Sequence, residues 1–255
     1  MENVLVIGAT GNVGVAAVLG ALQSKRHVLA IVRNQASADK LFKHVGTKNG
    51  ITTVEADIMS EGGVQRIVDQ VRAGKLPGFQ HVYSAAGGAY GATPLTELSL
   101  NELRQIMSIN FESNFCKIFI VEVAALVCPL TSIVAYRATI PYLLEQKKAT
   151  SFTLCTGAQG DIGARATPAI SQGPLFSMAN VACRDNTDSS VRFNEVYLNC
   201  RVEVDSSAAE TGAMKSSDFA RAYTELLSRS EIKSSRITVS THDDLKDLKH
   251  KKKIV

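Results

Sequence analysis

The chain has 255 residues, of which 45% are hydrophobic and 20% charged, and these values predict one globular domain with a sizeable core. Its formal net charge of +4 lies largely in residues 246–253, so the body is nearly neutral and the charge pattern argues against a nucleic-acid-binding surface. Five cysteines, an odd number without the spacing of metal ligands, favour reduced thiols in the cytoplasm over disulfides or a metal site. The first residues already read as a strand, which predicts no signal or transit peptide.

Short apolar runs alternate with helical stretches along the chain, a pattern typical of a parallel sheet covered on both faces. The predicted strands are Val4–Ile7, Val28–Val32, Thr52–Glu55, His81–Ser84, Phe152–Cys155, Arg192–Tyr197 and Arg236–Val239. The predicted helices are Val13–Gln23, Ser37–Lys43, Gly63–Arg72, Leu100–Phe115, Tyr136–Gln146, Leu175–Cys183 and Ser217–Ser228. Seven strands with right-handed crossovers predict a doubly wound, Rossmann-type α/β sheet in a single domain over residues 1–241. Residues 242–255 are expected to form a charged C-terminal tail, frayed in solvent, with a functional tail for an anionic partner as the alternative.

A glycine-rich loop follows the first predicted strand directly and leads into the first helix. Glycines at positions 8, 11 and 14 let the backbone turn tightly and approach a pyrophosphate, whose charge then sits at the helix N-terminus. The alternative is a purely structural turn. The loop predicts dinucleotide binding by Gly8, Thr10, Gly11, Asn12, Val13 and Gly14.

The end of the second predicted strand indicates which dinucleotide is bound. An NAD-binding protein usually has a carboxylate there that bonds the ribose hydroxyls, and such a carboxylate would repel a 2′-phosphate. Arg33 stands in that place, followed by Asn34, and a guanidinium binds phosphate through charge-assisted hydrogen bonds. Arg33 therefore favours NADP(H) over NAD(H), with a solvated surface arginine as the alternative.

Further motifs, together with the glycine loop, resemble the short-chain dehydrogenase/reductase family over residues 3–240. Asp57 and Ile58 resemble the pair that contacts adenine. Ser84-Ala85-Ala86-Gly87 resembles the family's Asn-Asn-Ala-Gly element, which implies that Ala85, Ala86 and Gly87 contact the cofactor. Asn110 matches the helix asparagine that holds a proton-relay water in active members.

The family's catalytic residues are Ser, Tyr and Lys, and this chain departs from that pattern. Thr156, or Gly157 as the weaker alternative, falls in the serine position, 14 or 13 residues before Ile170. Ile170 falls in the tyrosine position and Pro174 in the lysine position, and neither side chain can carry a proton. The resemblance therefore implies cofactor binding without the family's phenol-lysine proton transfer. The Pro-Gly pair that the family has after its next strand is also absent.

Other groups after the fifth predicted strand could take part in chemistry, because ligands bind outside the carboxyl ends of parallel strands. This loop offers Gln159, Asp161 and Arg165, with Gln172 beyond them. Asp161 can act as acid or base and Arg165 as a clamp on an anion, whereas a mutual surface ion pair is the alternative. The candidate catalytic residues are Asn110, Thr156 and Asp161. Substitute phenols, by residue type alone, are Tyr90, Tyr136 and Tyr197.

Residues 116–133 separate Asn110 from Thr156 by more than the resembled family allows. Without these 18 residues, the flanking sequence reads as one continuous helix. The segment is apolar, but Glu122 and Pro129 argue against a membrane hairpin, because a spanning helix needs about 20 apolar residues. It is either a genuine insertion or a translated intron, since its codons can contain a GTAAG donor and a CTAAC branch point in an in-frame length. A homo-oligomer is compatible with the family, and the insertion would perturb it.

Two classes of function remain open. In the first, the chain is an NADP(H)-dependent oxidoreductase acting on a small molecule, or a relative that uses the bound cofactor for isomerisation or cyclisation, with acid and base groups supplied from elsewhere. In the second, it is a non-catalytic dinucleotide-binding protein, such as a redox sensor, whose ligand state controls a partner. The resemblance favours the first class, whereas Ile170 and Pro174 favour the second.

Overall fold

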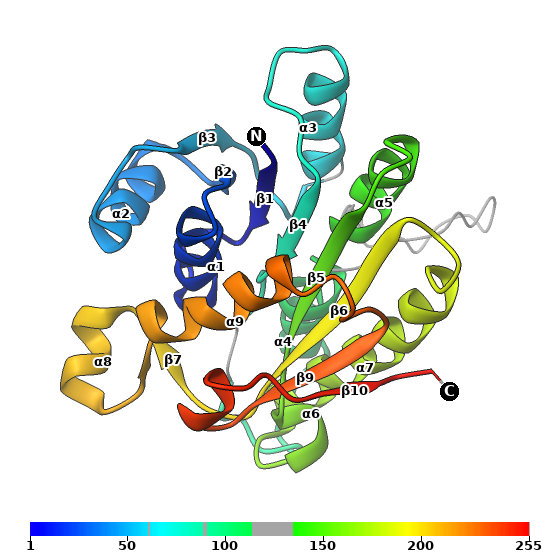
Figure 1. Ribbon diagram of the computed structural model, residues 1–255. Coiled ribbons are helices and arrows are strands. Elements are labelled where there is room, and N and C mark those ends of the chain that lie inside the picture. Colours follow the sequence, from blue (N-terminus) through cyan, green and yellow to red (C-terminus); the bar gives the residue numbers. More distant parts are fainter. Residues whose placement is uncertain (61, 89–90, 114–134, 255) are drawn as a thin grey trace, which may run out of the picture.

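The structure, a computed structural model, describes residues 1–60, 62–88, 91–113 and 135–254. Within these residues the main sheet has eight strands in the order β10-β9-β6-β5-β4-β1-β2-β3, parallel except for the antiparallel pairing of β10 with β9 (Figure 1). The strands of this sheet are β1 (Asn3–Ile7), β2 (His27–Val32), β3 (Ile51–Glu55), β4 (His81–Ser84), β5 (Thr150–Gly157), β6 (Val191–Leu198), β9 (Ser235–Val239) and β10 (His250–Lys252). A separate parallel pair consists of β7 (Val202–Glu203) and β8 (Met214–Lys215).

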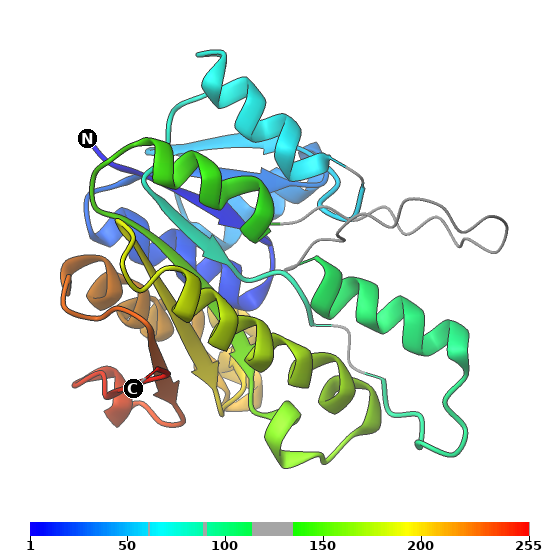
Figure 2. The ribbon, with the colours of Figure 1, turned by 90° about the vertical axis from the view of Figure 1, so that its right-hand side faces the viewer.

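Helices cover both faces of the sheet. One face carries α1, α2 and α9, and the other carries α3, α5 and α7, which lie in front of the sheet in Figure 2. The helices are α1 (Asn12–Gln23), α2 (Gln35–Val45), α3 (Gly63–Arg72), α4 (Leu100–Met107), α5 (Ala135–Glu145), α6 (Gln159–Ile162), α7 (Ala166–Asp185), α8 (Asp205–Thr211) and α9 (Ser216–Ser228). A π-helical turn, η1 (Ser108–Glu112), follows α4, and a 3-10 turn, η2 (Asp243–Leu245), precedes β10.

The central strands are apolar on both sides because both sides are buried. In β1, Val4 and Val6 face the core under α1 and α9, whereas Leu5 and Ile7 face the core under α3, α5 and α7. This alternation follows from the two-residue period of a strand. Full burial of each such side chain contributes about 1.5–3 kcal/mol, so the near-continuous apolar runs that identified the strands also stabilise the sheet.

The prediction of a single doubly wound α/β fold is confirmed, with one more strand in the main sheet than predicted. The extra strand comes from the segment expected to be a frayed tail, and that expectation is wrong. Leu245 and Leu248 are buried in the core beside α9, and β10 pairs with β9. These apolar contacts and ladder hydrogen bonds hold residues 242–254 on the domain despite their charge.

Three further elements differ from the predictions. The helix predicted over residues 100–115 changes to a π-turn at Ser108, where the N–H of Ser113 donates to the carbonyl of Ser108, five residues back. The helix predicted to begin at Leu175 begins at Ala166. Its first turns contain the polar residues Ser171 and Gln172, which can be buried there because both form hydrogen bonds within the protein. Helix α8 (Asp205–Thr211) falls between the last two predicted strands, where the sequence predicted no helix before Ser217.

The insertion proposed at residues 116–133 lies outside the described residues. Across the described residues, no helix combines the length and the apolar character that crossing a membrane requires.

Candidate cofactor and ligand site

The sequence-predicted cofactor residues gather at the carboxyl ends of the strands around β1 and β4. The order of the strands reverses between these two neighbours, and in open α/β sheets ligands bind in the crevice at such a switch point. The glycine loop follows β1, Arg33 follows β2, Asp57 follows β3, and Ala85 follows β4. Strands far apart in sequence thus deliver their ends to a single edge of the sheet (Figure 1).

The glycine loop has the geometry of a phosphate cradle. Gly8 has a φ of 81°, and a Cβ there would stand 2.8 Å from the carbonyl oxygen of Ala85. A Cβ on Gly14 would stand 2.0 Å from the carbonyl oxygen of Gly8, so only glycine lets α1 approach the loop this closely. Gly11 donates its N–H to the carbonyl of Gly8 at 3.1 Å and closes the turn.

The N-terminus of α1 is open to an anion. No side chain caps it, and its first turn holds no acidic residue. The unpaired N–H groups and the positive end of the helix dipole therefore face the loop without an internal partner, which suits a pyrophosphate. The loop fits the dinucleotide that the sequence predicts.

Asn12 has a structural role beside this cradle. Its Oδ1 accepts a hydrogen bond from the N–H of Val204 at 3.3 Å, and its carbonyl accepts from Ser216 Oγ at 2.7 Å. These bonds tie the start of α1 to the segment after β7 and to α9. Thr10 and Val13 are half-buried in the same loop.

Arg33 lies exposed after β2, at the start of α2. Asn34 caps α2 by accepting a hydrogen bond from the N–H of Ser37 at 2.9 Å, and the first turn of α2 holds no acidic residue. In the part of the chain that the structure describes, the Arg33 guanidinium forms no ion pair, so it is available to a phosphate. Asp57 is also exposed, with its carboxylate accepting from the N–H of Met59 at 2.9 Å, whereas Ile58 packs against the core.

Asn110 braces three segments at the strand ends. It is fully buried in η1, where its Oδ1 accepts from the N–H of Gly88 at 2.9 Å and its Nδ2 donates to Ser171 Oγ at 2.9 Å. The loop after β4, the π-turn and α7 are therefore held together by one carboxamide. Ala85, Ala86 and Gly87 lie in this braced loop.

Thr156 points into the protein. Its hydroxyl donates to Glu195 Oε1 at 2.7 Å, and the Glu195 side chain is 0% exposed. Arg236 donates to both oxygens of this carboxylate, from Nε at 2.9 Å and from Nη2 at 3.1 Å. The ammonium of Lys253 contacts Glu195 Oε2 as well. The candidate hydroxyl thus belongs to a buried charge cluster beneath α7.

Asp161 pairs with Arg236 at 3.6 Å, so the alternative of an ion pair with Arg165 is wrong. The reason is that Arg236 is held at this edge of the sheet by the rings of Tyr197 and Phe176, whose centroids lie 4.5 and 4.7 Å from its guanidinium carbon. Burial, and then the hydrogen bond with Asp161, raise the pKa of the Tyr197 phenol. A raised pKa makes this phenol a poorer proton donor at neutral pH.

Among the other two candidate phenols, Tyr136 lies away from the site. Tyr136 packs against Phe152 and Phe193 near the starts of their strands, and its oxygen accepts from Asn186 Nδ2 at 2.8 Å. Burial raises the pKa of this phenol too. Tyr90 lies outside the described residues.

The tyrosine and lysine positions share a face of α7. Ile170 and Pro174 are four residues apart, which is one helical turn, and the Ile170 side chain lies at the surface with 38% exposure. Pro174 is in the interior of the helix and not in its first turn. Gln172, between them, is buried and accepts a hydrogen bond from the N–H of Gly157 at 2.8 Å. The sequence drew attention to Gln172 by its place but gave no sign of this contact.

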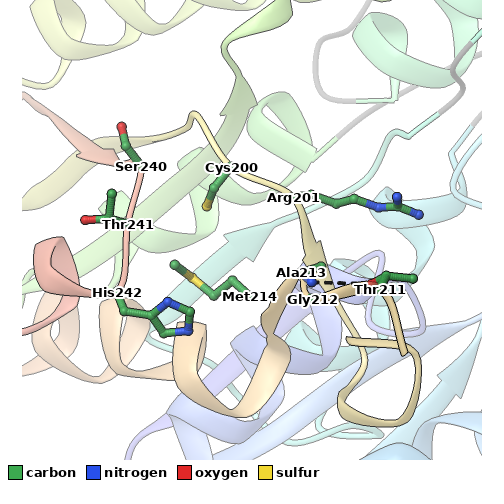
Figure 3. A pocket seen from close by; sticks show the side chains of 9 residues that line it. All are labelled: Cys200, Arg201, Thr211, Gly212, Ala213, Met214, Ser240, Thr241 and His242. Carbon is green, nitrogen blue, oxygen red and sulfur yellow. Dashed lines mark hydrogen bonds between the residues drawn. The ribbon is translucent and has the colours of Figure 1, made fainter. Parts of the chain in front are cut away.

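A separate hollow of about 330 Å³ lies beyond β6 and β9, beside the β7–β8 pair (Figure 3). Cys200, Met214 and His242 are among its lining residues, whereas the Arg201 side chain points away and pairs with Glu203 at 2.5 Å. Burial raises the pKa of the Cys200 thiol to about 11, which keeps it protonated at neutral pH. This hollow therefore offers no thiolate nucleophile.

Known proteins resemble the chain in sequence and in fold. The family model for short chain dehydrogenases matches residues 2–123, a stretch that ends before β5 and α7. A short-chain dehydrogenase/reductase of Pestalotiopsis fici, iacG, is 51% identical over 257 residues, covering 99% of this chain and 96% of the relative.

Solved structures match at lower identity. A short-chain type dehydrogenase/reductase from Mycobacterium ulcerans has a TM-score of 0.72 at 17% identity, covering 93% of this chain and 88% of its own. A short-chain dehydrogenase/reductase from Brucella melitensis, titled glucose/ribitol dehydrogenase, has a TM-score of 0.67 at 18% identity, covering 93% and 94%. At these identities the two structures show the shared fold alone.

Proposed function

Because the chain belongs to the short-chain dehydrogenase/reductase family, whose members bind NAD(P)(H) and small-molecule substrates, we propose that it is an NADP(H)-binding oxidoreductase that acts on a small organic molecule without a tyrosine-lysine pair. The observation that carries the proposal is the cradle after β1, in which Gly8 and Gly14 leave room for a pyrophosphate and the N-terminus of α1 is uncapped.

The preference for NADP(H) rests on Arg33. Its guanidinium is exposed beside the N-terminus of α2, where a 2′-phosphate would meet a charge-assisted donor and the positive end of a helix. Asp57 and Ile58 would contact the adenine, and Ala85, Ala86 and Gly87 would line the side of β4. When bound, the nicotinamide supplies or accepts a hydride.

The chain's own residues then bind and orient the reactants. Asn110 fixes the loop after β4 against α7, so the wall of the crevice is rigid. Ile170 presents an apolar surface where the family has a phenol. The proton of a reduced carbonyl would therefore come from water or from the ligand itself.

A titration with the two cofactors tests the proposal. The chain has no tryptophan, so the fluorescence of bound NADPH is measured directly, with NADH titrated in parallel. Replacing Arg33 with alanine removes a charge-assisted hydrogen bond of about 1.5–3 kcal/mol and should weaken NADPH binding about 10- to 100-fold, with NADH unchanged. Arg104→Ala, another exposed arginine, is the control. If NADPH does not bind the unaltered protein, the proposal fails.

A second candidate is a non-catalytic dinucleotide-binding protein. It is favoured by the contacts of the three candidate catalytic residues. Asn110, Thr156 and Asp161 each bind another side chain of the protein, so these polar groups are already engaged without a ligand. Loss of NADPH absorbance with a panel of aldehydes and ketones separates the two. Binding of NADPH without turnover of any member would support the second candidate.

A further inference from the structure

The Gln172 side chain lies in van der Waals contact with the position that a Cβ on Gly157 would take. Gly157 ends β5 at the carboxyl edge of the sheet. A Cβ built on it would have Gln172 Oε1 and Cδ as its nearest neighbours, at 3.6 and 3.7 Å. Gly157 also stands 13 residues before Ile170, one of the two registers for the family's serine. Thr156, in the other register, turns its hydroxyl toward buried Glu195.

The orientation of the Gln172 carboxamide follows from its partner. A backbone N–H only donates, so the atom 2.8 Å from the Gly157 nitrogen is Oε1, and Nε2 is directed elsewhere. In the described part of the chain Nε2 donates to no protein acceptor, and it is not sealed from solvent. Gln172 as a whole is only 8% exposed. A nearly buried side chain thus keeps two unused donors.

The neighbours of Gln172 hold it in place. Ser171 is bonded to Asn110 and to the carbonyl of Thr167, which anchors this turn of α7 against η1. Ile170 and Pro174, on the two sides of Gln172 in sequence, have no side-chain polar group that could compete for a ligand. The carboxamide is therefore preorganised by bonds made before any ligand arrives.

We infer that Gln172 Nε2 binds the carbonyl oxygen of the small-molecule ligand and replaces the hydroxyl donor missing at position 157. The inference rests on the proposed function and names the class of its ligand, an aldehyde or ketone. A hydroxyl both donates and accepts, whereas Nε2 only donates, so its partner on the ligand must be an accepting atom such as a carbonyl oxygen. Donors of this type also stabilise negative charge that develops on a carbonyl oxygen.

Binding of 4-nitrobenzaldehyde and 4-nitrotoluene, which share a ring and differ in the carbonyl, tests the inference. Both are titrated against protein saturated with NADP⁺, so that no reduction occurs, and ligand-observed NMR gives the affinities. The wild type should bind the aldehyde about five- to tenfold more tightly, the value of one neutral hydrogen bond. Gln172→Met should remove this preference, and Gln65→Met, which replaces a half-buried glutamine on α3, should keep it.

A second variant separates ligand binding from folding. Gln172→Glu keeps an acceptor for the Gly157 N–H but turns an oxygen toward the ligand, so it should lose the aldehyde preference while binding NADPH as the wild type does. A wild type that does not prefer the aldehyde, or variants that keep the preference, would overturn the inference. If NADPH itself does not bind, the proposed function fails first, and the two failures are thereby distinguished.

Discussion

Replacing Lys253 with methionine should destabilise the protein by about 2 kcal/mol, although sequence alone places this residue in a frayed tail. Its ammonium contacts the carboxylate of Glu195, and the two side chains are 6% and 0% exposed. A hydrogen bond to a charged group contributes about 1.5–3 kcal/mol, and breaking a buried ion pair costs about 3–5 kcal/mol. The lower part of this range applies because Arg236 still donates to both carboxylate oxygens after the change.

Urea unfolding followed by far-ultraviolet circular dichroism measures the change in the free energy of unfolding. In a thermal scan, the melting temperature should fall by about 4–8 °C. Lys246→Met is a matched control from the same segment, because Lys246 and its partner Asp243 are 73% and 82% exposed and should contribute little. Glu195→Gln should cost about 3–5 kcal/mol, since it leaves two cations facing each other. The reasoning is refuted if Lys253→Met changes the free energy of unfolding no more than Lys246→Met does.

Two further predictions concern pH and the interior of α7. Burial, the largest cause, lowers the pKa of His81 to about 4, below the value of about 6.5 in an unfolded chain, so the unfolded state binds the proton first. The contribution of neutral His81 to the free energy of unfolding should therefore be fully present above about pH 6.5 and fall by about 2 kcal/mol by pH 5. Urea midpoints measured across this pH window test the prediction, with exposed His27→Gln as the control. A His81→Phe variant whose stability falls with pH as steeply as that of the wild type would contradict it. Pro174→Ala restores an N–H for the carbonyl of Ile170 and should raise the free energy of unfolding by about 1–2 kcal/mol. Pro168→Ala, in the first turn where no such bond is lost, should have less effect, and an equal effect would count against this account.

The fold was predictable because its signals are local. Apolar runs of strand length, separated by helical stretches, gave all seven predicted strands, and the glycine loop identified the first crossover. The eighth strand was not predictable from His250-Lys251-Lys252, because a charged run pairs with β9 only once Leu245 and Leu248 are anchored in the core. Such an anchor depends on contacts distant in sequence.

The sequence indicated the position of the candidate site at the strand ends, but not the hydrogen bonds that its side chains form. The spacing of the glycines, and the place of Arg33 after β2, indicated where a dinucleotide would lie. No spacing shows that Thr156 donates to Glu195 or that Gln172 accepts from Gly157, because these partners come from different elements. One signal was present in the strand itself: Arg192, Asn194 and Glu195 interrupt a strand whose position in a parallel sheet demands burial.

The short antiparallel strand β10 also affects how copies of this chain can meet. It covers β9, and its own three residues are exposed and basic or histidine, which are features that keep sheet edges from pairing with one another. Like charges would face each other if two such edges approached. Association through a continuous sheet is therefore disfavoured at this edge, which leaves the β3 edge and the helical faces as the surfaces through which copies could meet.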